Sequence, residues 1–290
     1  MYLEKLESVA KKIVYLRPRR FGKTLFTSMM QYYYDVNSID KFDSLFKDTY
    51  VYNNPTSYKN NYYVLKFDFS GMTINPKDEK ELLDSFKDKL YDGVNKFLLH
   101  YDLEFEINKT LNPAEFLSHF LNFFSSLRLD KKIYIIIDEY DNFTNSILSN
   151  NKKIFKKILG TDGFIKAFYA RIKENTGSII DRVFITGVCS VSLDSMTSGF
   201  NIATNITTDF RFNSMTALTH EEVKKLINDI DCDNKEKVFS EMLENYDGYN
   251  FSRRIIDRVF NPTLTMYYLN SLSNIGLPPE ELLDSNIISN

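Results

Sequence analysis

The sequence predicts an α/β fold with a parallel sheet and flanking helices, followed by a smaller helical domain of the lid or winged-helix-like type. Short apolar, β-branched segments alternate with segments of helical periodicity through most of the chain, which is typical of a doubly wound domain. From Leu218 onward the pattern changes to short helices. We therefore expect one domain at residues 1–215 and a second at residues 216–290.

The elements of the first domain follow from periodicity and end signals. Residues 2–9 predict a short helix before a strand at 13–16, and helices are expected at 25–34, 79–100 and 152–175. A further helix should begin with Asn112 as its N-cap and Pro113 in its first turn. Other strands are expected at 62–70, 131–137 and 182–188, and residues 193–209 as a long loop without periodicity.

The second domain has its own helix signals. Thr219-His220-Glu221-Glu222 reads as a capping box that opens the first helix, and further helices are expected at 235–246, 261–272 and 279–284.

Composition restricts the class of protein. Among 290 residues, 43% are hydrophobic and 15% aromatic, enough for a substantial core. The net charge of −3 gives no global basic field, so the chain does not support nucleic-acid binding. Two cysteines form no disulfide framework, which favours a reducing compartment and predicts a cytoplasmic, intracellular protein. No apolar run approaches the roughly 20 residues of a membrane span.

The first strand runs into a segment that ends in Gly22-Lys23-Thr24, with a helix after it. A strand, a loop closed by Gly-Lys-Thr and a helix build a phosphate-binding loop, or Walker A motif. Backbone amides and the helix N-terminus face the anion, and the lysine reaches the terminal phosphates. The full pattern would have glycine at 17, where this chain has Arg17, so the motif is degenerate.

The third strand ends in two adjacent carboxylates, Asp138 and Glu139. At the carboxyl end of a parallel strand, Asp138 is placed to orient Mg²⁺ through its water shell, as in a Walker B motif. Glu139 is then placed to polarise the water that attacks a γ-phosphate. The alternative is two solvated acids at a strand end, which the phosphate loop upstream makes less favourable. Loop and acidic strand together predict a P-loop NTPase-type sheet.

Thr186 ends the fourth strand. A polar side chain at the tip of the strand beside the acidic one can sense the γ-phosphate or position the water, and Thr186 fits that place. The alternative is a β-branched residue selected for strand propensity.

Arginines surround the loop. Arg19 and Arg20 could bind phosphate oxygens and stabilise transition-state charge, and we expect at least one of them to touch nucleotide. The alternative for both is ion pairing elsewhere on the domain. Arg211, Arg253 and Arg254 are weaker candidates for a nucleotide contact from the helical domain.

Five motifs in this order resemble the AAA-ATPase-like proteins, a STAND-related P-loop family. They are Leu16-Arg17-Pro18-Arg19-Arg20-Phe21-Gly22-Lys23-Thr24-Leu25, Ile136-Ile137-Asp138-Glu139-Tyr140-Asp141, Phe184-Ile185-Thr186-Gly187-Val188, Asp247-Gly248-Tyr249-Asn250-Phe251 and Asn261-Pro262. The resemblance covers nearly the whole chain, and Arg17 in place of glycine is the family's own pattern.

The resemblance implies ATP and Mg²⁺ as cofactors. Nucleotide-binding residues would be Arg17, Gly22, Lys23, Thr24, Leu25 and Asp138. Of these, Thr24 and Asp138 would hold Mg²⁺. The catalytic group would be Glu139, Thr186, Arg19 and Arg20.

Family members often carry a C-terminal nuclease-like domain of the PD-(D/E)XK type. We expect no such domain before Asn290. We also expect that the segment that precedes the first strand in this family is shortened here. The Glu222 and Lys224 pair lies on a predicted helix without a preceding acidic strand, so we interpret it as helix surface.

The sequence therefore predicts an ATP-binding and ATP-hydrolysing module. An alternative is a nucleotide-dependent switch with slow or absent hydrolysis that regulates a protein partner or acts through self-association. A third is a scaffold that has lost nucleotide binding, against which the intact Lys23, Thr24, Asp138 and Glu139 argue.

Overall fold

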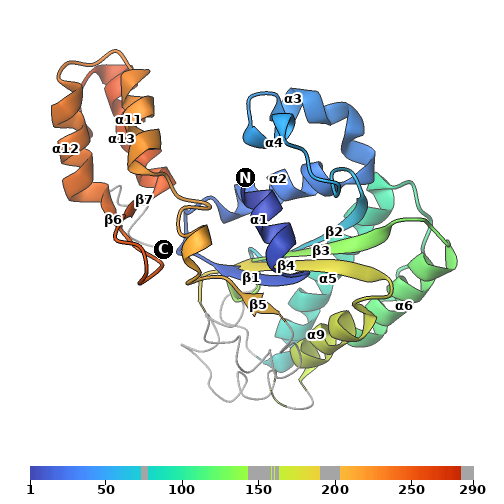
Figure 1. Ribbon diagram of the computed structural model, residues 1–290. Coiled ribbons are helices and arrows are strands. Elements are labelled where there is room, and N and C mark those ends of the chain that lie inside the picture. Colours follow the sequence, from blue (N-terminus) through green and yellow to red (C-terminus); the bar gives the residue numbers. More distant parts are fainter. Residues whose placement is uncertain (73–77, 143–157, 159, 161–162, 190–202, 282–290) are drawn as a thin grey trace. The chain divides into compact units, whose positions relative to one another are not determined.

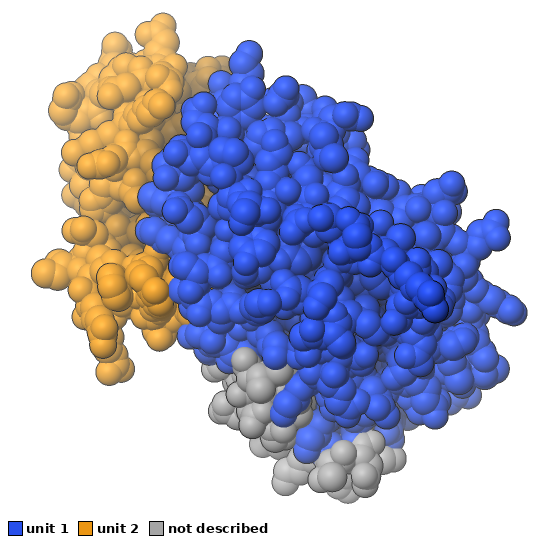
Figure 2. Space-filling view, turned by 45° about the vertical axis from the view of Figure 1, so that its right-hand side comes forward, with its two compact units in different colours: residues 1–17, 24–205 blue, residues 18–23, 206–290 orange. Residues whose placement is uncertain are grey.

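The computed structural model describes residues 1–72, 78–142, 158, 160, 163–189 and 203–281. The chain divides into two compact units, coloured separately in Figure 2. Unit 1 consists of residues 1–17 and 24–205, and unit 2 consists of residues 18–23 and 206–290. The division therefore differs from a boundary at 215/216, and it places the segment 18–23 with the helical part of the chain.

Unit 1 is built on a five-stranded parallel sheet with the order β2-β3-β4-β1-β5 (Figure 1). The strands are β1 (Lys12–Leu16), β2 (Tyr62–Asp68), β3 (Lys132–Asp138), β4 (Ile180–Gly187) and β5 (Thr204–Asn205). The α/β class with a parallel sheet is thus confirmed. The short β5 lies within 193–209, which was expected to lack structure, and pairs with Ile13 and Val14 of β1; residues 190–202 lie outside the described residues.

The inner strands are buried on both faces, which explains their continuous apolar sequence. Ile133, Ile135 and Ile137 of β3 belong to the main core with α5, α6 and α9. Tyr134, from the opposite face of β3, packs against Tyr34 of α2 at a ring-centroid distance of 5.0 Å.

Helices cover both faces of the sheet, as Figure 1 shows. On one side lie α1 (Tyr2–Val9) and α2 (Lys23–Tyr34), and on the other α5 (Glu79–His100), α6 (Pro113–Ser126) and α9 (Phe164–Asn175). Between α2 and β2 come η1 (Val36–Lys41), α3 (Phe42–Phe46) and α4 (Tyr50–Asn53). The predicted start of α6 is confirmed: Asn112 caps it, Glu115 completes a capping box, and Pro113 is its first residue.

Two helix boundaries differ from expectation. Helix α2 begins at Lys23 rather than residue 25, so the lysine of the Gly-Lys-Thr segment is already its first residue. The helix expected at 152–175 is not continuous, because Gly163 has extended backbone and α9 begins only at Phe164. Most of the expected first half, 152–162, lies outside the described residues.

Unit 2 contains a small helical core. Its elements after residue 205 are η2 (Phe210–Phe212), α11 (His220–Asn228), α12 (Lys235–Tyr246), the antiparallel ribbon β6 (Asp247–Tyr249) with β7 (Val259–Phe260), and α13 (Pro262–Ile275). Apolar faces of the three helices meet around Met242, Phe260 and Tyr268. The helix expected at 279–284 is not formed by residues 279–281, and residues 282–290 lie outside the described part.

The capping box of α11 is confirmed, and it accounts for Glu222. The Thr219 hydroxyl accepts from the Glu222 amide, and the Glu222 carboxylate accepts from the Thr219 amide at 2.8 Å. Lys224 lies over the Phe239 ring, 4.7 Å from its centroid. Both side chains therefore have structural roles on the helix surface. Among the described helices, none has the length and apolar character needed to cross a membrane.

Candidate functional site

Three polar side chains share one face of the sheet near its carboxyl edge. Side chains alternate between the two faces along a strand, and the odd-numbered positions of β2, β3 and β4 point into the core with α5, α6 and α9. Lys66, Asp138 and Thr186 are even-numbered positions on these strands, so they lie on the opposite face. That face is covered by α2, whose Phe26 packs against Phe184 of β4.

Thr27 of α2 links the start of the helix to the acidic end of β3. Its hydroxyl lies 2.9 Å from the Thr24 carbonyl oxygen and 3.1 Å from Asp138 Oδ2. The single hydroxyl proton serves one acceptor at a time, and a carboxylate is the stronger acceptor. Because Thr27 and Asp138 are both fully buried, this contact fixes the first turn of α2 relative to β3.

Lys66 completes a buried cluster around Asp138. Its ammonium donates to the Thr27 hydroxyl at 3.0 Å and lies 3.9 Å from Asp138 Oδ2. Burial lowers the pKa of Lys66, while the nearby Asp138 and Asp68 oppose that change. The cation thus offsets part of the cost of burying the Asp138 carboxylate.

Glu139 differs from Asp138 in environment although the two are adjacent. Asp138 is fully buried, whereas Glu139 is only partly buried. The Glu139 backbone is left-handed, with φ of 51°, and its amide donates to Asp138 Oδ1 at 3.1 Å. Left-handed non-glycine residues are strained and concentrate at functional sites, where the surroundings hold them. The two carboxylates are therefore suited to different tasks.

Thr186 lies at the end of β4, between the loop strand β1 and the acidic strand β3. Its side chain is fully buried, and within the described residues its hydroxyl has no hydrogen-bond partner. A buried hydroxyl without a partner costs about 1–3 kcal/mol, so its retention favours a role with a ligand or water.

Tyr140 and Asp141 fasten the end of β3 to the end of β4. Asp141 is buried and accepts from the amides of Val188 at 3.1 Å and Cys189 at 2.6 Å. The Tyr140 hydroxyl donates to the Cys189 carbonyl, and its amide donates to the Thr186 carbonyl at 3.1 Å. These bonds set the two strand ends that carry Asp138 and Thr186 in a fixed relation.

Gly187 lies where these bonds leave no room for a side chain. A Cβ at this position would overlap Asp141 Oδ1 and lie 2.5 Å from a ring carbon of Tyr140. We therefore expect Gly187→Ala to destabilise the protein by about 1–3 kcal/mol, seen as a lower midpoint in chemical denaturation. Gly248→Ala is the matched control, since nothing lies within 4 Å of its Cβ position. Equal midpoints for the two variants would contradict this packing.

Residues 18–23, which make up most of the phosphate-binding loop predicted at 17–24, belong to unit 2. Lys23 is buried, and its ammonium donates across the loop to the Pro18 carbonyl at 2.9 Å. Arg20 and Gly22 both have left-handed backbone, with φ of 67° and 69°. Such a path turns the chain tightly, which is how consecutive amides come to face one anion.

The loop's flanking residues lie in distinct environments. Arg17 is buried, with its guanidinium 4.4 Å from the Tyr15 ring centroid and donating to the Leu16 carbonyl at 2.8 Å. Burial lowers the pKa of Arg17. Arg19 and Thr24 are exposed, and Leu25 is 77% exposed. The Arg17 side chain is thus engaged with its own strand, while its role toward nucleotide stays a prediction.

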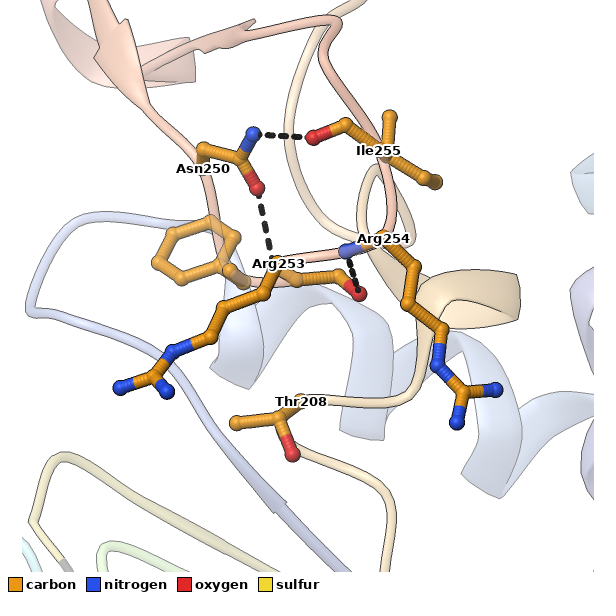
Figure 3. Close-up of a pocket in the computed structure, with 7 residues that line it drawn as sticks. Thr208, Asn250, Arg253, Arg254 and Ile255 are labelled. Carbon is orange, nitrogen blue, oxygen red and sulfur yellow. Dashed lines mark hydrogen bonds between the residues drawn. The ribbon is translucent and has the colours of Figure 1, made fainter.

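The three candidate arginines of unit 2, Arg211, Arg253 and Arg254, differ in their contacts. Arg211 pairs with Asp209 at 2.5 Å and lowers the pKa of that carboxyl by hydrogen bonding. Arg253, Arg254 and Thr208 are among the residues that line an open hollow of about 820 Å³ in unit 2 (Figure 3). Within the described residues neither of these two guanidinium groups forms an ion pair, so both remain available for an anion.

The donor set fits a nucleotide-bound Mg²⁺ rather than a metal held by protein alone. No group of three or more His, Cys, Asp or Glu side chains among the described residues is placed to hold an ion. Mg²⁺ typically takes one or two protein oxygens and completes its shell with phosphates and water. Thr24 is an exposed residue, whereas Asp138 is buried with both oxygens in contact with protein groups, so Asp138 fits a water-mediated role.

Sequence reasoning missed Thr27 and Lys66. It also missed the hydrogen bonds by which Asp141 joins the end of β3 to the residues after β4. Thr27 follows Thr24 by three residues on a helix, and that spacing places both on one face. Lys66 is a charged residue inside an otherwise apolar strand, a pattern that signals a buried partner.

A family model described as a predicted AAA-ATPase matches residues 1–197. The match covers more than half of the chain, and the chain belongs to this AAA-ATPase-like family. The matched range includes the phosphate loop, the acidic end of β3 and Thr186, whereas unit 2 beyond residue 205 lies outside it. A comparison with curated proteins found no match.

Proposed function

We propose that the chain is an AAA/STAND-type module that binds ATP with Mg²⁺ and hydrolyses it. The observation that carries the proposal is the Thr27 contact, which joins the helix after the Gly-Lys-Thr loop to the carboxylate at the end of β3. This contact supports the proposal, because in a P-loop ATPase the phosphate-binding and metal-orienting groups act on one triphosphate. Membership of a family described as predicted AAA-ATPase supports it.

Each residue has a role in this proposal. Lys23 and the loop amides bind the β- and γ-phosphates, and one of Arg19 and Arg20 stabilises developing charge. Glu139, partly exposed beside the buried Asp138, accepts a proton from the attacking water. Thr186 supplies its hydroxyl to the γ-phosphate or to that water, which would satisfy its buried oxygen.

Thr24 and Asp138 hold Mg²⁺ in the proposed site, Thr24 through its hydroxyl and Asp138 through a water. The ion, when bound with ATP, neutralises phosphate charge. Lys66 helps to orient the Asp138 carboxylate through its ammonium and the Thr27 hydroxyl.

A nucleotide-dependent switch is the second candidate. The observation that favours it is the division of the chain, in which the phosphate loop groups with unit 2 while the rest of α2 and the acidic strand group with unit 1. Occupancy of the loop would then act on the helical unit even where hydrolysis is slow.

Magnesium removal tests the role of Asp138. We expect the dissociation constant for ATP to rise about fivefold or more when EDTA replaces Mg²⁺, because ion and nucleotide bind cooperatively. Asp138→Asn should lose most of that difference, since the amide keeps the size of the side chain but not its charge. The measurement is a fluorescence titration of wild type and variant under both conditions, with circular dichroism to confirm folding. An equal magnesium effect in both proteins would remove Asp138 from the metal site.

A further inference from the structure

We infer that the β6–β7 ribbon and the start of α13 hold the phosphate loop in its binding conformation, with Thr263 as the positioning residue. This inference rests on the proposed function for its effect on ATP, but its structural part is independent of it. It assigns a role to the Asp247-Gly248-Tyr249-Asn250-Phe251 and Asn261-Pro262 motifs, which the proposed chemistry does not use.

The first observation is strain in the loop. Arg20 is not glycine, yet its φ is 67°. A residue other than glycine keeps this conformation only where neighbouring groups determine it. The Thr263 hydroxyl donates to the Arg20 carbonyl at 2.8 Å, so it holds the peptide that follows the strained residue.

The second observation is an aromatic clamp on the next residue, Phe21. Its ring is fully buried and meets Tyr249 and Phe251 edge-on, at centroid distances of 4.8 and 5.3 Å. Ala217 and Val259 complete the same cluster. Edge-to-face aromatic contacts add specific geometry to the burial of apolar area, so the ring anchors the middle of the loop.

Thr263 and the two aromatic residues that contact Phe21 are fixed by further hydrogen bonds. Asn261 caps α13 by accepting from the Thr263 amide at 2.9 Å, which fixes the residue that carries the hydroxyl. The Phe251 amide donates to the side chain of buried Asn213 at 2.9 Å, and Tyr249 pairs with Val259 across the ribbon. Thr263 and the clamp are therefore rigid supports rather than chance neighbours.

Arg20, the residue whose carbonyl Thr263 holds, lies three residues before Lys23, the lysine that the proposed function uses. Lys23 begins α2 and donates back to the Pro18 carbonyl, so its position depends on the path of residues 18–22. If Arg20 relaxes, the amides and the ammonium no longer face one anion. Thr263 therefore acts on ATP through the loop, without touching the nucleotide.

Thr263→Val tests the inference, because it removes the hydroxyl and keeps the shape. We expect faster hydrogen exchange of the amides of residues 19–23 without nucleotide. We also expect a dissociation constant for ATP raised about two- to tenfold, the contribution of one hydrogen bond. Thr263→Ser should restore both values. A general loss of stability would instead speed hydrogen exchange throughout the chain and lower the midpoint in chemical denaturation.

Thr265→Val is the matched control. It makes the same change two residues further along α13, where the hydroxyl is buried and has no hydrogen-bond partner within the described residues. The inference is overturned if Thr263→Val and Thr265→Val give the same loop exchange and the same ATP affinity. If the wild type does not bind ATP, the proposed function fails, and the exchange measurement alone still decides whether Thr263 holds the loop.

Discussion

Lys23→Ala is expected to weaken ATP binding by a factor of about 10 to 100. Lys23 provides the ammonium at the start of α2, and a hydrogen bond to a charged group contributes about 1.5–3 kcal/mol. In this structure its ammonium donates to the Pro18 carbonyl within the same segment, at 2.9 Å. Isothermal titration calorimetry of wild type and variant measures the effect.

The control for this variant is Lys237→Ala, which removes the same charge from an exposed position on α12. Its ATP affinity should match the wild type, because exposed ion pairs contribute little. Should Lys23→Ala bind as tightly as Lys237→Ala, the assignment of residues 17–24 as a phosphate-binding loop would be wrong.

Glu139→Gln is expected to lower ATP turnover by a factor of about 10² to 10⁴ while ATP still binds. Glutamine preserves size and hydrogen bonding but cannot accept the proton of the attacking water. The left-handed backbone at this position should be retained, since the two side chains have the same branching. Phosphate release under saturating ATP gives the rate, and an equilibrium titration gives the affinity.

Glu174→Gln on α9 is the corresponding control, because Glu174 is exposed and pairs only with nearby Arg171 in the contacts described. Turnover at the wild-type rate in Glu139→Gln would show that another group is the catalytic base. If the wild type binds ATP without measurable turnover, the switch is the better description of this chain.

Much of unit 1 was predictable because its signals are local. A buried parallel strand has a continuous apolar sequence, and β3 (Lys132–Asp138) lies within one residue of the strand expected at 131–137. The helix caps were equally predictable: Asn112 is the N-cap of α6, and in unit 2 Thr219 with Glu222 forms the expected capping box. The order of the strands follows from neither signal, since it depends on how the crossover helices pack.

The cluster around Asp138 was not predictable, because it depends on contacts between distant residues. Thr27 and Asp138 are separated by 111 positions, and their hydrogen bond exists only once α2 lies on the sheet. The same is true of Thr263 and Arg20, 243 positions apart. The sequence contained one hint of each contact. Thr27 lies at helical spacing from Thr24, and Thr263 follows the Asn261-Pro262 motif, but neither pattern indicates which residue is the partner.

The most direct test of the central claim is calorimetric titration of the wild-type chain with ATP in the presence of Mg²⁺. The proposed site predicts saturable binding of about one ATP per chain, with a dissociation constant in the range of about 1 μM to 1 mM that enzymes show for their substrates. The absence of saturable binding across that range would contradict the account, because the loop and the acidic strand would then form no nucleotide site.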